Sequence, residues 1–98
     1  MAVGGRSFEG TGLTFRSERP VVVMITWDRR GISILSTADV SVRLRTGVFV
    51  PGLSADKARK RVWGRIGGAP KSQGPWLLLP LLEGEEVRIG GHRGGGGG

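Results

Sequence analysis

The sequence contains no cysteine, tyrosine or asparagine, and it has one histidine in 98 residues. The absence of cysteine excludes disulfides, thiolate nucleophiles and Cys-based zinc sites, and a single histidine excludes a metal cage built from several imidazoles. Ser54 and Lys57 have the Ser-x-x-Lys spacing of penicillin-recognising enzymes, but the Ser-Asp-Asn and Lys-Thr-Gly partners of that motif are missing. We therefore predict a protein that is not an enzyme and that needs no metal or cofactor.

Long hydrophobic runs are also missing. The two strongest runs, 21–27 and 76–82, have seven residues each, whereas a helix needs about 20 to cross a bilayer. The first residues also lack the apolar stretch of an export signal. We predict no transmembrane segment, and an intracellular location is favoured. Import into mitochondria is an alternative, because three arginines precede residue 20, although Glu9 and Glu18 are atypical of a presequence.

The length of 98 residues allows one domain, and 27 of them are Leu, Ile, Val or Phe, enough to fill a small core. The 19 glycines are concentrated towards both ends of the sequence. The composition divides the chain into a Gly-rich segment over 1–19, an ordered unit over 20–63 and a Gly- and Pro-rich part over 64–98. Within the last part we expect a linker, an apolar strip and a flexible tail.

Residues 20–36 predict a β-hairpin. A β-branched strand over 21–27 follows Pro20, residues 28–31 form a turn that ends in glycine, and a second strand covers 32–36. This loop length places apolar residues opposite apolar residues. The predicted pairs are Trp27 with Ile32 and Ile25 with Ile34.

A second hairpin is predicted from the parity of the next apolar residues. Strands over 40–44 and 48–50 flank a three-residue loop, with Gly47 in the left-handed conformation. Arg43 and Phe49 would then share the exposed face. The predicted fold class is an all-β or β-rich domain with an antiparallel four-strand meander, to which residues 7–16 can add a strand. The face expected to be buried consists of Val40, Val42, Leu44, Val48 and Val50.

The apolar period changes towards that of a helix after Pro51. Ser54 is a suitable N-cap, and the spacing predicts one short helix over 55–63. Residues 64–75 contain four glycines and two prolines, which predict a linker. The apolar strip over 76–82 follows this linker. Because it contains Pro80, we do not expect it to be a central strand. The C-terminal third is expected to be flexible and Gly-rich.

Positive charge is the main functional signal. The net charge is +7, and arginine outnumbers lysine 12 to 3. Residues 54–75 hold six basic residues and one acid, a pattern typical of phosphate binding. We therefore predict a nucleic-acid-binding module for RNA or single strands. The expected phosphate ligands are Lys57, Arg59, Lys60, Arg61 and Arg65, with Trp63 for base stacking and Arg43 with Phe49 on the sheet face.

Three other interpretations remain open from the sequence. The basic residues of the helix predicted over 55–63 can form an ordinary solvent-exposed face, with Trp63 packed in the core. The strip over 76–82 can be a docking surface of a scaffold protein, with Trp76, Leu78 and Leu81 contacting a protein partner. The richness in Gly, Arg, Val and Trp also fits translation of a G-rich strand, and therefore a reading frame without a selected function.

Overall fold

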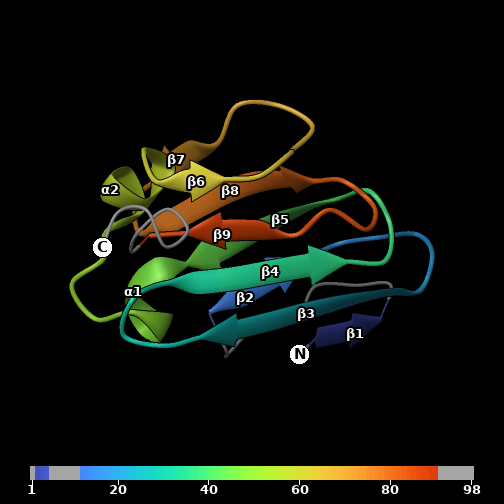
Figure 1. Cartoon of the computed structure of the whole chain (residues 1–98). Coiled ribbons are helices and arrows are strands. Elements are labelled where there is room, and N and C mark those ends of the chain that lie inside the picture. Colours follow the sequence, from blue (N-terminus) through green and yellow to red (C-terminus); the bar gives the residue numbers. More distant parts are fainter. Residues whose placement is uncertain (1, 5–11, 91–98) are drawn as a thin grey trace.

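The computed structural model describes residues 2–4 and 12–90, which form two antiparallel β-sheets packed face to face (Figure 1). The prediction of a β-rich fold is confirmed. The first sheet has the order β1 (Ala2–Gly4), β3 (Val21–Trp27), β4 (Ile32–Ser36), β9 (Val87–Ile89) and β6 (Val62–Trp63). The second sheet has the order β2 (Leu13–Phe15), β5 (Val40–Arg45), β8 (Trp76–Leu81) and β7 (Lys71–Gln73). Two short helices follow β5, namely α1 (Thr46–Phe49) and α2 (Ala55–Arg59).

The core lies between the two sheets, and the longer strands contribute to it by alternation of buried side chains. In β5, Val40, Val42 and Leu44 are buried and the residues between them are exposed. In β8, Leu77, Leu79 and Leu81 are buried in the same way. The buried residues of both sheets belong to one hydrophobic cluster. Alternation works here because successive side chains of a strand point to opposite faces of its sheet.

The first hairpin forms as predicted. Trp27 pairs with Ile32 and Ile25 pairs with Ile34 in the antiparallel register of β3 and β4. The Asp28 carboxylate Oδ1 accepts hydrogen bonds from the backbone N–H groups of Arg30 at 2.7 Å and Gly31 at 3.2 Å. This side-chain cap closes the turn, as Asp commonly does at the first position.

The predicted second hairpin is wrong. Residues 46–49 form helix α1, the Thr46 hydroxyl donates to the Leu53 carbonyl at 2.7 Å, and Gly47 has no positive φ. Val48, expected inside, is 54% exposed, whereas Phe49, expected on an open face, is buried. A strand over 48–50 has no place beside β5, because β2 and β8 already pair with both edges of β5.

The meander therefore ends after its second strand. The connection of residues 37–39 crosses from β4 in the first sheet to β5 in the second, so these consecutive strands are not neighbours. The Thr37 hydroxyl accepts a hydrogen bond from the Val22 N–H at 3.0 Å, and the Ser36 hydroxyl donates to the Ala38 carbonyl at 2.6 Å. These bonds hold the crossing at the edge of the core.

The helix predicted over 55–63 is shorter and ends at Arg59. The Ser54 hydroxyl caps it by accepting the Lys57 N–H, as predicted. The chain then enters the first sheet, where Val62 pairs with Ile89 and Trp63 with Arg88. Both residues have high β-propensity, and the free edge of β9 satisfies their backbone groups.

Residues 64–90 also differ from the expected linker and flexible segment, because they contain β7, β8 and β9. The apolar strip is β8, a central strand between β5 and β7. Pro80 is tolerated there because β7 pairs with β8 only as far as Leu78, and the Pro80 carbonyl accepts the Gly67 N–H at 2.7 Å. Residues 91–98 of the expected flexible tail and residues 7–11 of the expected strand over 7–16 lie outside the described residues, but β2 forms within that strand at residues 13–15.

Candidate nucleic-acid interface

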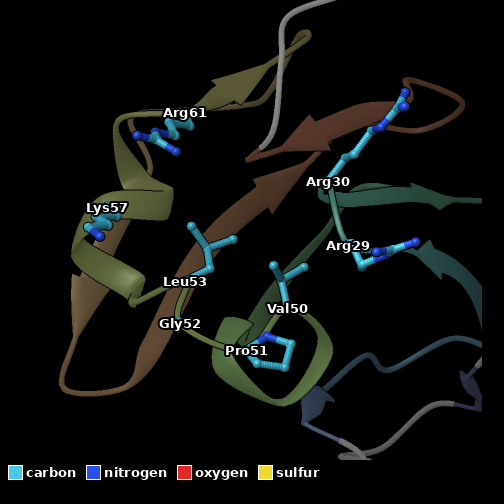
Figure 2. A pocket seen from close by; sticks show the side chains of 8 residues that line it. All are labelled: Arg29, Arg30, Val50, Pro51, Gly52, Leu53, Lys57 and Arg61. Carbon is cyan, nitrogen blue, oxygen red and sulfur yellow. The ribbon is translucent and has the colours of Figure 1, made fainter.

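A pocket of about 360 Å³ lies at one end of the sandwich, where the first hairpin turns and where α1 and α2 are located. We call this the basic end. The pocket is lined by two basic residues from the hairpin loop and two from residues 55–61, with apolar residues between them (Figure 2). We call residues 55–61, which include helix α2, the α2 segment. Within residues 2–4 and 12–90, no carboxylate lines the pocket. The lining residues are Arg29, Arg30, Val50, Pro51, Gly52, Leu53, Lys57 and Arg61.

The four basic residues lie on two sides of the pocket, and the guanidinium ends of Arg29 and Arg30 extend away from Lys57 and Arg61. In Figure 2, Lys57 and Arg61 lie on one side and Arg29 and Arg30 on the other, with Leu53 and Val50 between them. All four cationic side chains are exposed, whereas Val50 and Leu53 are buried. The pocket therefore combines an apolar floor with a rim of positive charge.

Local packing and hydrogen bonds fix the backbone that carries each pair of basic residues. Ala55 and Ala58 are buried and anchor α2 on the core, so Lys57 projects to the solvent side of the helix. The Arg61 carbonyl accepts the Gly90 N–H at 2.9 Å, which ties the end of the α2 segment to the strand β9. On the other side, the Asp28 cap holds the loop that carries Arg29 and Arg30.

Asp28 is the carboxylate of this loop, and its side chain accepts hydrogen bonds from the loop backbone. The hydrogen bonds from Arg30 and Gly31, followed by the positive charges of Arg30 and Arg88, lower the pKa of this carboxyl. Because the folded-state pKa is lowered, the ionised cap stabilises the hairpin above the unfolded-state pKa. This contribution is lost as the pH falls through the lowered folded-state value.

Asp28→Asn is expected to tighten the binding of polyanions at the pocket by roughly 2-fold to 5-fold at low salt, because it removes one negative charge beside the rim. The Asn side-chain oxygen can still accept both backbone bonds of the turn. Asp39→Asn is the matched control, since the Asp39 carboxylate accepts the Glu83 N–H at 2.8 Å in the loops at the opposite end. Fluorescence anisotropy with a labelled oligonucleotide measures both variants, and an equal gain in the two would contradict a local effect.

Of the five phosphate ligands predicted from the sequence, the structure brings Lys57 and Arg61 together at the pocket. Arg59 forms an ion pair with Asp56 at 3.2 Å on the exposed face of α2. Lys60 is the exposed C-cap of the helix, and Arg65 is exposed in the loop after β6. These three cations add to the positive charge of the α2 segment without lining the pocket.

The predicted stacking residue Trp63 is not on the helix. It lies in β6, is half-buried, and stands opposite Arg88 in the first sheet. Arg43 is exposed on the outer face of the second sheet, with its guanidinium carbon 4.9 Å from the centre of the Trp76 ring. Phe49 does not share this face, because it is buried in α1 against Trp27. A joint surface of Arg43 and Phe49 is therefore corrected to one of Arg43 and Trp76.

The outer face of the second sheet carries further positive charge. The cross-strand register places Arg43 opposite Leu78, and Leu78 opposite Lys71, while Arg45 stands opposite Trp76. Residues directly opposite share one face of a sheet. Arg43, Arg45 and Lys71 are exposed on this face, and Arg45 directly precedes α1 at the basic end.

Sequence reasoning missed Arg29, Arg30 and the exposed Trp27 as candidate binding residues. The signal for the arginines was present, because a four-residue turn exposes its middle positions. Their meeting with Lys57 and Arg61 depends on which strands pair over long distances, and that pairing was not predicted.

The apolar strip over 76–82 does not form an exposed docking surface. Leu77, Leu79 and Leu81 are at most 2% exposed, and Leu78 and Trp76 are half-buried on the other face. In the described part of the chain, no helix could span a membrane.

The chain shows no significant match to any protein-family model, to any curated protein or to any solved structure.

Proposed function

We propose that this protein is a non-catalytic nucleic-acid-binding module that holds RNA or a single strand by its phosphates at the basic end. The observation that carries the proposal is the pocket, to which two separate segments each contribute two cations and whose lining, among the described residues, contains no carboxylate. A phosphate placed there releases counterions, which favours binding without a preference for sequence. The lining supplies cations and apolar surface, so its chemistry suits binding.

The size of the pocket supports a nucleotide-sized occupant. Its volume of about 360 Å³ lies at the lower end of the range of about 300–1,000 Å³ found for ligand sites. One phosphate with its sugar or base fits this scale better than a metal ion or a folded domain. The apolar floor formed by Val50 and Leu53 can contact the uncharged part of the nucleotide, while the rim contacts the phosphate.

The distribution of acids supports a defined orientation. Glu18, Asp39, Glu83 and Glu85 lie in the loops at the end opposite the pocket (Figure 1). Near the pocket, the charge of Asp28 is bound by the hairpin backbone and that of Asp56 by Arg59. The separation of charge directs a polyanion to the basic end as it approaches.

A salt titration of the 98-residue protein against a labelled 12-nucleotide single strand tests the proposal. If the four cations of the pocket each contact a phosphate, affinity should fall by about 50-fold between 50 and 200 mM salt. In Lys57→Ala/Arg61→Ala the slope of log affinity against log salt should become less steep by the contribution of two phosphate contacts, about 0.7 each. Affinity at low salt should fall at least about 10-fold.

The matched control is Arg16→Ala/Arg19→Ala. It removes the same charge from two exposed residues in the loop between β2 and β3, at the other end of the sandwich. Its salt slope should stay close to that of the parent. No binding at 50 mM salt would refute the proposal, and equal losses in both double variants would place the interaction away from the pocket.

A further inference from the structure

Trp27 is an exposed aromatic side chain at the basic end. It is 52% exposed, although it continues the buried face of Val23 and Ile25 along β3. Its cross-strand partner Ile32 is buried. Trp27 is the last residue of β3, and about half of its large apolar ring is therefore exposed to solvent at the edge of the core.

The ring is held by a second aromatic residue. Its centre lies 4.8 Å from that of Phe49, with an angle of 71° between the ring planes, an edge-to-face arrangement. Phe49 is itself buried in the hydrophobic cluster. A ring fixed in this way loses little conformational entropy when a ligand stacks on its open surface.

Two connections place Trp27 next to the pocket. Along the chain it precedes the pocket residue Arg29 by two positions, a separation of at most about 7 Å between α-carbons. Through space it contacts Phe49, which is followed directly by the pocket residue Val50. Asp28 lies between Trp27 and Arg29, and its carboxylate accepts hydrogen bonds from two backbone N–H groups of the loop.

We propose that Trp27 stacks on an unpaired base whose adjoining phosphate occupies the cationic pocket, so that the site selects single strands over duplexes. The inference rests on the proposed function and adds the residue that would give the preference for single strands. A duplex buries its base faces in its own stack, whereas an unpaired base offers a free face to an aromatic ring. Trp76 is less suited to this role, because the Arg43 guanidinium covers its ring.

The test compares three 12-nucleotide DNA ligands of equal length: a single strand, a duplex, and a strand that lacks its bases. The parent should bind the single strand about 5-fold to 150-fold more tightly than the base-free strand, the range expected for one stacked base. Trp27→Leu should lose this preference, because leucine keeps an apolar contact to Phe49 but has no ring. Its affinity for the duplex and the base-free strand should stay unchanged, which also shows that it is folded.

Two further variants separate stacking from packing. Trp27→Phe should keep part of the preference, since it keeps an aromatic ring. Trp76→Phe should keep all of it. Tryptophan emission should be quenched by the single strand in the parent, and this quenching should be lost in Trp27→Leu.

The outcomes distinguish the two proposals. Binding of all three ligands with equal affinity by the parent, or a Trp27→Leu variant that keeps the full preference, would overturn the stacking inference and leave the proposed function standing. Equal loss for all three ligands in Trp27→Leu would also overturn it, since that pattern indicates damage to the pocket. No binding to any of the ligands would overturn the proposed function as well.

Discussion

Gly64→Ala should lower the unfolding temperature by roughly 10–35 °C, a loss of about 2–6 kcal/mol in the free energy of unfolding. Gly64 has φ +124°, a conformation that side-chain-bearing residues rarely adopt, and an added Cβ would lie 2.6 Å from the backbone oxygen of Glu86. Strained backbone of this kind costs about 1–3 kcal/mol and overpacking about the same again. The obstacle is backbone, so it cannot move aside as a flexible side chain could.

Gly47→Ala is the matched control for this prediction. Gly47 is exposed, has no positive φ, and its added Cβ would meet only the Leu53 oxygen at 3.9 Å. In a helix, alanine replaces glycine with a gain of up to about 1 kcal/mol. Thermal unfolding followed by circular dichroism measures both variants. Similar melting temperatures for the two would show that the close approach of Gly64 to Glu86 is wrong.

The contrast between the first hairpin and residues 46–50 shows where the sequence was informative. The hairpin of β3 and β4 was predicted to its register because its information is local: alternating β-branched residues, a capping aspartate and a glycine at the turn exit. Gly47 follows a similar local pattern after β5, but there the prediction failed. The reason is not local, because β2 and β8 occupy both edges of β5 and leave no partner for a strand over 48–50.

The candidate site was predictable only in part for the same reason. A basic segment around Lys57 and Arg61 can be read from composition, and the structure places both at the pocket. Arg29 and Arg30 lie about 30 residues earlier, and their proximity depends on the packing of the two sheets. Charge patterns therefore identified two of the four basic residues that line the pocket, and long-range pairing brought the other two beside them.

Substitutions in the strip over 76–82 distinguish a core strand from a docking surface, because the two interpretations give opposite effects on stability. Leu81 is 2% exposed, pairs with Val40 and forms an isolated bridge with Ile66. Leu81→Ser should cost about 3–8 kcal/mol, from the lost apolar group with its cavity and from a hydroxyl buried without water. A domain of this size has about 5–15 kcal/mol in total, so most or all of its stability should be lost.

Leu78→Ser serves as the comparison, because Leu78 is half-buried on the outer face opposite Arg43. It should cost about 1 kcal/mol, since much of its surface already contacts solvent. Urea unfolding followed by tryptophan fluorescence gives both values. If the strip were a docking surface, both variants would keep their stability and lose association to the same degree. A cooperative transition in Leu81→Ser at the urea midpoint of the parent would therefore remove β8 from the core, and with it the packing that positions α2 and the basic end.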